Sequence, residues 1–465
     1  MISRRKLLAF AAAAPLTAAV GGEDQDPHRP RYHFLPPRNW MNDPNGLVWH
    51  EGKYHLFYQY NPNAAVWGDM HWGHAESADL IHWKHLPIAL APVPGGYDKD
   101  GVFSGCCRVY NGVPTIFYTG VSPETQNIIT GNGALTEFKR YSGNPVIARP
   151  PAGLDLTAFR DPCVWRDGSE YRMAIGAGLK GGNGTVLLYT SSDLFHWTYR
   201  QPLASAASRD DGEIWECPNF FPLGKRKWFL CVSSTGPVRV PFYWTGSYRD
   251  LRFSPESPRQ KLDHGGYYYA PQAFEDARRR LVIFGWIPEG RTKAEQVAAG
   301  WAGVQSLPRL LGVAPDGALT IEPLPELSVL RGAQLDPQNL HGDSLEIFAE
   351  FPRERPAGLS IRRTPDGSEQ TNLDFAPGTA TLTTDRRRAS LNAGTDRDRR
   401  TVTLDLPPSE PLRLRVFLDR SLVEIYVNGR TCISTRIYPT RADALGVKVS
   451  GEPRVLDAWE MRSAL

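Results

Sequence analysis

The sequence predicts an all-β protein in which a five-bladed β-propeller is followed by a C-terminal β-sandwich. Three observations support this prediction. Pairs of strands recur at a nearly constant period over the first two thirds of the chain, a second short pattern keeps the same period, and the period then stops before a run of shorter strands. The length of 465 residues exceeds what one hydrophobic core usually supports, so two domains are expected.

The repeating unit is a strand, a short polar turn and a second, very apolar strand. The turns contain Asn-Gly, Asp-Gly and similar pairs, which are typical of β-hairpins. The five apolar strands are expected at residues 54–60, 114–120, 171–176, 228–233 and 281–286, and they begin 60, 57, 57 and 53 residues apart. Strand units repeated at this period predict one propeller blade each.

A second pattern keeps the same period. The segment Ser-Ala-Asp-Leu-Ile-His-Trp at 77–83 returns as Ser-Ser-Asp-Leu-Phe-His-Trp at 191–197, displaced by 114 residues, which is twice 57. Two independent patterns with one period make a chance similarity a poor explanation. We therefore expect His82 and His196 to have architectural roles.

The domain boundaries follow from where the period stops. We expect the propeller over residues 30–325, a linker over 326–340 and the sandwich over 341–465. In the last range, short alternating strands end in turns such as Asn428-Gly429, as in a sandwich.

Residues 1–25 are expected to be a signal peptide. Arg4 and Arg5 precede the short apolar run 9–20, and the paired arginines suggest the twin-arginine export route. The apolar run is too short for a comfortable bilayer span, so the mature form is not expected to lie in a membrane. The expected location is the periplasm or the extracellular space.

Composition excludes several functional classes. The chain is 41% hydrophobic and 22% charged with a net charge of +3, so neither disorder nor nucleic-acid binding is expected. Arginine clusters at 386–388 and 397–400 are interleaved with Asp and are expected to be solvated turns. The six cysteines form no Cys-x-x-Cys pair, which argues against a zinc or redox motif. Most of them are expected to be buried, unpaired small side chains.

Three carboxylates occupy equivalent positions in the repeat. Asp43, Asp161 and Glu216 each precede the apolar strand of their unit by roughly a dozen residues, and each is followed within two residues by Pro. This position corresponds to the innermost strand of a blade, next to the propeller axis. Alone, each could be structural, for example an Asp-Pro turn or a salt bridge between Asp161 and Arg160. Together they predict an acidic catalytic cluster in one funnel.

The motifs around these acids resemble those of a known family. The segments Trp-Met-Asn-Asp-Pro-Asn-Gly at 40–46, Arg-Asp-Pro at 160–162, Glu-Cys-Pro at 216–218 and Leu-Asp-Arg-Ser-Leu-Val-Glu-Ile-Tyr-Val-Asn at 418–428 are similar to those of the invertase/fructan hydrolase family of β-fructofuranosidases. These are retaining glycoside hydrolases with a five-bladed propeller. The resemblance covers nearly the whole mature chain.

The resemblance implies a role for each acid. Asp43 would be the nucleophile that forms a covalent fructosyl-enzyme, Glu216 the acid/base and Asp161 the transition-state stabiliser. The substrate-binding residues implied are Trp40, Asn42, Gln59, Trp67, Phe103, Ser104, Arg160 and Trp286. Sucrose or a fructan is the implied partner. No cofactor and no metal is expected, and His71 and His74 are interpreted as parts of a strand rather than as ligands.

Three functions stay open at this point: an exo-acting fructosidase, a fructosyltransferase on the same scaffold, and a non-catalytic fructan-binding propeller. The third is expected to have lost one of the three acids, which are all present. The stretch 235–241 contains Arg239 but no acid, where plant invertases use an acid and a lysine to hold glucose. This favours fructans (inulin or levan) over strict sucrose specificity. Glu424 in the sandwich is expected to face solvent or the domain interface.

Overall fold

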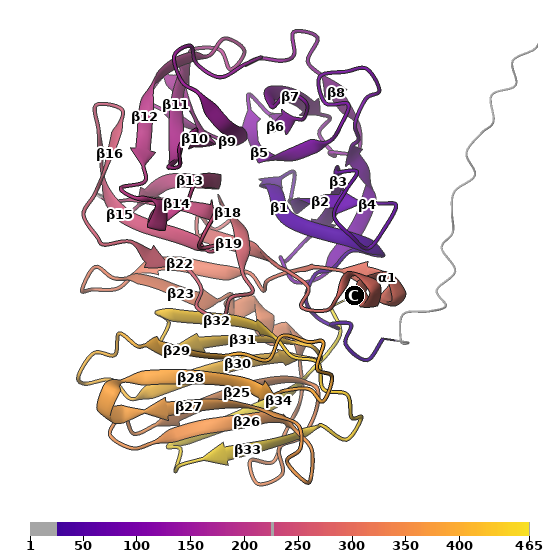
Figure 1. The fold of residues 1–465 in the computed structure, drawn as a ribbon, viewed down its shortest axis with the longest axis vertical. Helices are drawn as coiled ribbons and strands as arrows, with labels where there is room; N and C mark the ends of the chain where they lie inside the picture. Colours follow the sequence, from indigo (N-terminus) through magenta and orange to yellow (C-terminus); the bar gives the residue numbers. More distant parts are fainter. Residues whose placement is uncertain (1–25, 225–226, 465) are drawn as a thin grey trace, which may run out of the picture.

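The computed structural model describes residues 26–224 and 227–464, so the expected signal peptide lies outside the described residues. Two bodies built of strands lie one above the other, a ring of blades and a two-layered sandwich (Figure 1). In the described part of the chain, no helix is long and apolar enough to cross a membrane. The fold is the predicted one, a five-bladed propeller followed by a sandwich.

Each blade is a twisted antiparallel sheet with its first strand nearest the axis. Blade one contains β1 (Asn39–His50), β2 (Lys53–Asn61), β3 (His71–Ser77) and β4 (Trp83–Leu90). Blade two contains β5 (Val102–Tyr110), β6 (Val113–Gly120), β7 (Thr125–Gly131) and β8 (Phe138–Arg140). Blade three contains β9 (Leu156–Asp167), β10 (Glu170–Leu179), β11 (Gly184–Ser191) and β12 (Thr198–Ser205).

The last two blades carry short additional strands. Blade four contains β13 (Ile214–Leu223), β14 (Lys227–Thr235), β15 (Pro241–Arg249), β16 (Arg252–Pro255) and β17 (Gln260–Lys261). Blade five contains β18 (Tyr269–Glu275), β19 (Leu281–Ile287), β21 (Val304–Gln305), β22 (Arg309–Val313) and β23 (Leu319–Pro323). The five expected apolar strands are therefore β2, β6, β10, β14 and β19, the second strand of every blade.

The ring closes between the last blade and the first. After β19 the chain forms the short helix α1 (Lys293–Ala299) and then β20 (Trp301–Ala302), which pairs in parallel with Asn39 and Trp40 at the start of β1. The innermost strands contact one another in sequence, and β18 contacts β1. Because β20 pairs with the start of β1 and β2 pairs with its other edge, β1 has a hydrogen-bonded neighbour on both sides at Asn39 and Trp40.

The repeated seven-residue pattern forms the turn between the third and fourth strands of blades one and three. The Ser77 hydroxyl accepts the Leu80 N–H at 2.9 Å, and Asp79 Oδ1 accepts the His82 N–H at 2.8 Å. The copy at 191–197 has the same bonds, at 2.9 Å in both cases. Side chains that satisfy backbone donors explain why the pattern recurs. The architectural interpretation of His82 and His196 is consistent with this.

The sandwich consists of a six-stranded and a five-stranded antiparallel sheet. The first sheet has the order β24 (Arg331–Gln334), β34 (Val455–Met461), β25 (Ser344–Phe351), β30 (Leu412–Asp419), β31 (Leu422–Val427), β32 (Thr431–Arg436). The second has the order β29 (Arg399–Thr403), β28 (Thr381–Arg388), β27 (Gln370–Ala376), β26 (Ala357–Arg363), β33 (Gly446–Ser450). Alternate residues of β25, including Leu345, Ile347 and Phe351, are fully buried between the sheets, as expected from the period of two in a strand.

Two expectations differ from the structure in this region. Residues 326–340, expected to be a linker, contribute to a 3₁₀ helix (Pro325–Leu330) and to strand β24, which pairs with β34. Leu327 and Leu330 are buried, so this segment belongs to the packed core. Arg386 was expected in a solvated turn but is 1% exposed, because Asp396 and Asp398 both pair with its guanidinium.

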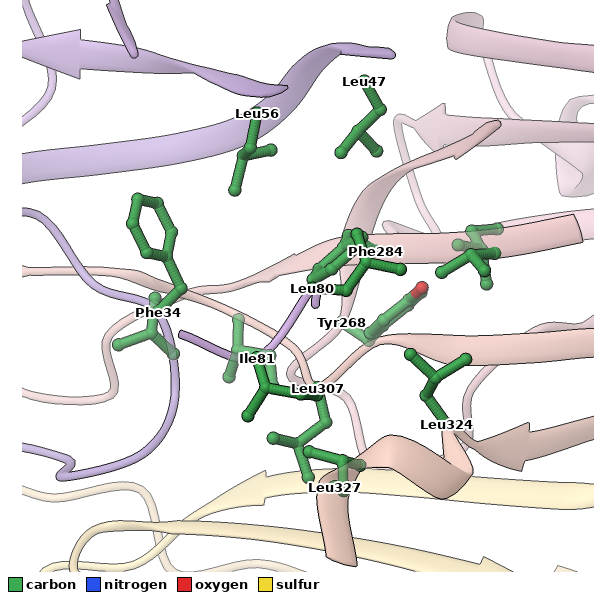
Figure 2. Close-up of a cluster of buried hydrophobic side chains, with 14 of the residues drawn as sticks. Phe34, Leu47, Leu56, Leu80, Ile81, Tyr268, Phe284, Leu307, Leu324 and Leu327 are labelled. Carbon is green, nitrogen blue, oxygen red and sulfur yellow. The ribbon is translucent and has the colours of Figure 1, made fainter. Parts of the chain in front are cut away.

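One hydrophobic cluster joins the two domains. It contains residues of blades one and five together with Phe417, Leu422 and Tyr426 of the sandwich. Figure 2 shows Leu307 and Leu327 of this cluster directly above the sandwich strands, with Phe34 and Ile81 beside them. Continuous apolar packing across the junction argues for a fixed relation between the propeller and the sandwich.

Candidate active site

Every innermost strand is irregular near the propeller axis. In each blade, a bulge shifts the register between the innermost strand and the second strand. The innermost strands are β1, β5, β9, β13 and β18. Asp161, Cys217 and Ala270 have positive φ angles of 64°, 47° and 46° there. A bulge turns the side chains next to it out of the ordinary alternation. The prolines after the three acids fit this irregular backbone, because Pro cannot donate to a regular ladder.

Two of the three predicted acids contact one cysteine. Cys217 Sγ lies 3.4 Å from Asp43 Oδ2 and 3.5 Å from Asp161 Oδ2, so the two carboxylates share its single proton, and the Cys217 N–H donates to the same Asp161 oxygen at 2.9 Å. Glu216 is the residue before Cys217. The charge of Glu216 acts on both Asp43 and Asp161. The three acids therefore come together from blades one, three and four, although Asp43 and Glu216 are 173 positions apart in the sequence.

Asp43 is partly buried, and three hydrogen-bonding groups surround its carboxylate. Ser104 Oγ donates to Oδ2 at 2.7 Å, Asn42 Nδ2 donates to Oδ1 at 3.0 Å, and the Cys217 thiol is the third donor. Burial raises the pKa of Asp43 above its usual value, the hydrogen bonds from Ser104, Asn42 and Cys217 oppose this, and the negative charge of Glu216 adds to it. Trp40 in turn holds Asn42, since its indole N–H donates to Asn42 Oδ1 at 2.7 Å.

The acidity of Asp161 is strongly altered by its surroundings. Burial raises its pKa to about 7, the Arg160 guanidinium opposes the rise, and the charges of Glu216 and Asp43 add to it. Three carboxylates in one confined site cannot all ionise without cost. Such a cluster has the features of a catalytic centre.

Glu216 is fixed through both of its oxygens. Oε1 accepts hydrogen bonds from Arg160 at 2.8 and 3.1 Å, and Oε2 accepts the Tyr269 hydroxyl at 2.6 Å. The other side of the Arg160 guanidinium pairs with Glu124 at 2.6 Å. The guanidinium of Arg239 lies 4.8 Å from the centre of the Tyr269 ring, so a second cation packs on the ring whose hydroxyl donates to this acid.

The expected aromatic residues surround the acids on two sides. The rings of Trp40 and Trp286 lie 5.6 Å apart and pack in one cluster with Cys217. The rings of Trp67 and Phe103 are 6.3 Å apart next to Ser104, and the Trp67 side chain is 61% exposed. A sugar binds well to such a site, because aromatic faces match its C–H surface.

Gln59 lies deeper than the other expected binding residues. Its side chain is 2% exposed, and its Nε2 donates to the carbonyl of Val102 at 3.0 Å. In this structure Gln59 therefore joins blade one to blade two beside Phe103. Its contact with the site is indirect, because it holds the β5 backbone next to Phe103 and Ser104.

Three residues of the site were not singled out from the sequence. Tyr269 precedes Ala-Pro on β18 as Glu216 precedes Cys-Pro on β13, so the same repeat position could have identified it. Cys217 is one of six cysteines of which most were expected to be buried small side chains, and nothing in its spacing indicates contact with two acids. Glu124 lies in the loop between β6 and β7, outside the repeat, and carries no sequence signal.

The histidines of blade one pair with each other. His55 Nδ1 and His74 Nε2 are 3.0 Å apart, and both side chains are buried. Among the described residues, no three His, Cys, Asp or Glu side chains are grouped so as to hold a metal ion. All six cysteines are buried and unpaired.

Comparison with known proteins agrees with this architecture. Residues 33–323 match the glycosyl hydrolases family 32 N-terminal domain, and residues 326–458 match the glycosyl hydrolases family 32 C-terminal domain. A sucrose-6-phosphate hydrolase of Zymomonas mobilis is 33% identical over 90% of this chain and 88% of that enzyme. A cell-wall β-fructofuranosidase of Zea mays is 31% identical over 94% of this chain and 90% of that enzyme.

Solved structures give the same result. Fructan 1-exohydrolase IIa of Cichorium intybus superposes with a TM-score of 0.85 at 28% identity, covering 94% of this chain and 98% of that one. Its complex with 1-kestose superposes equally well. Both domains and the order of their elements are therefore shared with these enzymes. The chain belongs to glycosyl hydrolase family 32 and is a glycoside hydrolase of the β-fructofuranosidase class.

Proposed function

We propose that this enzyme is an exported, retaining β-fructofuranosidase that releases terminal β-D-fructosyl residues from fructans such as inulin or levan, from sucrose, or from both. The observation that carries the proposal is that Asp43, Asp161 and Glu216 lie in one site: Cys217 contacts the first two, and the charge of Glu216 acts on both of them. A retaining glycosidase needs two carboxyl groups roughly 5–5.5 Å apart on either side of the scissile bond. The charge of Glu216 acts directly on Asp43, which supports the placement of these two acids in one site.

Asp43 is the proposed nucleophile. Its carboxylate attacks the anomeric carbon of the fructosyl unit, the bond from that carbon to the leaving oxygen breaks, and a covalent fructosyl-enzyme forms. Donors from Ser104 and Asn42 fix the orientation of the carboxylate before substrate arrives. Fixed orientation lowers the cost of reaching the transition state.

Glu216 is the proposed acid/base. It gives a proton to the leaving oxygen in the first step and removes a proton from water in the second. Arg160 and Tyr269 hold its two oxygens, so the same side chain can serve both steps without moving. Asp161 is the proposed stabiliser of the positive charge that develops on the fructosyl ring.

The choice between fructan and sucrose as substrate depends on the part of the site that receives the leaving group. Arg239 lies on the ring of Tyr269, whose hydroxyl meets Glu216, and the stretch 235–241 brings no acid to pair with a glucosyl unit. This favours fructans as substrates. Export rests on residues 1–25 and is tested by cell fractionation of the full-length protein against a variant in which Arg4 and Arg5 are replaced by Lys.

One assay panel tests the proposal. Sucrose, inulin and levan are incubated with the wild type and with Asp43→Ala, and the products are resolved by size. Free fructose from the wild type and none from the variant supports the assignment, and equal release by both overturns it. Trisaccharides and longer products at high sucrose concentration would instead indicate a fructosyltransferase on the same scaffold.

A further inference from the structure

Glu424 is a buried sandwich residue whose donors come mainly from the other domain. It lies on β31 and its side chain is inaccessible to solvent. Oε1 accepts the Leu307 N–H at 2.7 Å and faces His33 Nε2 at 3.2 Å. Oε2 accepts Arg309 at 2.9 Å and the hydroxyl of Tyr426 at 2.8 Å. Three of these four partners belong to the propeller side of the junction.

His33 is charged in this environment. Its Nδ1 lies 2.8 Å from Asp419 Oδ2 while its Nε2 faces Glu424, so a carboxylate lies at both ring nitrogens and both must carry protons to donate. Burial opposes the charge, but the hydrogen bonds and charges of Asp419 and Glu424 raise the pKa of His33 above its usual value. Glu424 is therefore opposite two buried cations, His33 and Arg309.

The two segments held by Glu424 lead directly to the nucleophile. Gln305, two residues before Leu307, donates its backbone N–H to the carbonyl of Phe34 at 2.8 Å. Its buried side chain donates through Nε2 to the carbonyl of Asn42 at 2.7 Å. Asn42 is covalently joined to Asp43 and also donates to its Oδ1. A short path thus runs from the sandwich through Leu307 and Gln305 to the backbone that carries Asp43.

We propose that Glu424 is a positioning residue of the sandwich domain, which sets the placement of the Asp43 strand through His33, Leu307 and Gln305. The inference rests on the proposed role of Asp43 as nucleophile. It gives the sandwich a part in catalysis in addition to covering the propeller. Displacement of a nucleophile by about 1 Å can lower the rate roughly a hundredfold. Holding the backbone of residue 42 in place therefore preserves the rate.

The sandwich offers a matched control in Glu346. This carboxylate lies on β25 in the same sheet, is equally inaccessible, and pairs with Arg331 at 2.8 Å and Arg415 at 2.7 Å. Both of its cations belong to the sandwich. Removing its charge breaks a buried ion pair, as at Glu424, without touching the path to Asp43.

The experiment compares Glu424→Gln with Glu346→Gln in the full-length enzyme, well below the melting temperature of each variant. We expect both to lower the melting temperature, but only Glu424→Gln to lower kcat, by about tenfold or more, with a smaller change in KM. Equal kcat values for the two variants would overturn the proposal. Loss of activity in Asp43→Ala, measured in parallel, shows that such a result concerns Glu424 and leaves the proposed function standing.

A second variant keeps the test decisive if Glu424→Gln does not fold. Gln305→Leu removes the hydrogen bond to the Asn42 carbonyl and leaves every contact of Glu424 in place. We expect it to lower kcat in the same way while the melting temperature changes less than in Glu424→Gln. Full wild-type kcat in Gln305→Leu contradicts the path and overturns the inference.

Discussion

Asp161 accepts the backbone N–H of Cys217 at 2.9 Å, so one of the three site acids itself joins blade three to blade four. The same carboxylate is buried, with a pKa of about 7. Its left-handed φ of 64° is a conformation that Asn adopts as readily as Asp. Replacement by Asn therefore changes the charge with little backbone cost.

The first prediction concerns the stability of Asp161→Asn. The pKa of Asp161 is higher in the folded protein, about 7, than its ordinary 3.8, so the folded state binds the extra proton. Stability associated with this group is present below about pH 4 and is lost as pH rises through 7. We expect the free energy of unfolding of Asp161→Asn to exceed that of the wild type by about 1–4 kcal/mol at pH 8, with a much smaller difference at pH 4.

The same variant should lose activity while it gains stability. Asn cannot supply the negative charge that the fructosyl transition state needs, so we expect kcat/KM to fall at every pH. Urea titrations at pH 4 and pH 8, with kinetics on sucrose and inulin, measure both effects. An Asp161→Asn variant that is less stable than the wild type at pH 8 would contradict the burial argument.

The second prediction separates the roles of Glu216 and Asp43. Glu216→Gln cannot give a proton, so we expect kcat on sucrose or inulin to fall by about 10²–10⁴-fold. A fructoside with an activated aryl leaving group needs no such proton, and its first step should be affected far less. Asp43→Ala should be inactive on both substrates. Burst kinetics of aryl release resolves the two steps, and an equal loss on both substrates would remove Glu216 from the acid role.

The sequence repeat predicted the fold and the equivalent positions of the three acids within the repeat, because both depend on local sequence patterns. All five apolar strands and the common position of Asp43, Asp161 and Glu216 could be identified in this way. Contacts between blades could not. The Cys217 thiol meets Asp43 only because bulges on β1 and β13 turn both residues toward the axis, and a bulge has no fixed sequence pattern.

Composition also did not indicate which charged side chains are buried. Arg386 lies in an arginine-rich stretch that is typical of solvated turns, yet Asp396 and Asp398 pair with it in the interior. Glu424 was expected at solvent or at the domain interface, and it lies at the interface with His33 and Arg309. Charges are buried where partners from distant segments meet them, and a single segment cannot indicate that.

The third prediction concerns Gly303, which follows β20. Its φ is +81°, and a Cβ there would lie 2.0 Å from the carbonyl oxygen of Met41 and 2.8 Å from Trp286 Nε1. We expect Gly303→Ala to destabilise the protein by more than about 3 kcal/mol, and to lower kcat because Met41 and Trp286 adjoin the site. Chemical denaturation and steady-state kinetics measure the two effects.

Gly52 provides the control for this prediction. It has nearly the same φ, +83°, in the turn between β1 and β2, but a Cβ there would meet nothing within 4 Å. Gly52→Ala therefore has the backbone cost alone, about 1 kcal/mol, and should keep wild-type kcat. If the two variants lost equal stability, the close approach of Gly303 to Met41 would have no energetic consequence.

The last prediction concerns acid stability and the buried pair His55 and His74. Burial lowers the pKa of His55 to about 4, with the charges of His50 and Lys53 acting in the same direction against Glu76. Burial also lowers the pKa of His74 well below its ordinary 6.5. In the unfolded chain both rings take up protons near pH 6.5, but in the folded protein they resist protonation. The unfolded state therefore binds more protons between about pH 6.5 and 4, and stability falls as pH falls through that window.

His55→Gln removes one of the two protonation sites while keeping a polar side chain beside His74. We expect its melting temperature to decline less steeply than that of the wild type between pH 6.5 and 4.5, and the two curves to run parallel above pH 7.5, where both rings are neutral in either state. Calorimetric scans at half-unit pH steps measure the slopes. Identical slopes below pH 6.5 would mean that His55 takes up its proton at nearly the same pH in the folded protein as in the unfolded chain. The buried core of blade one would then tolerate a charge beside His74.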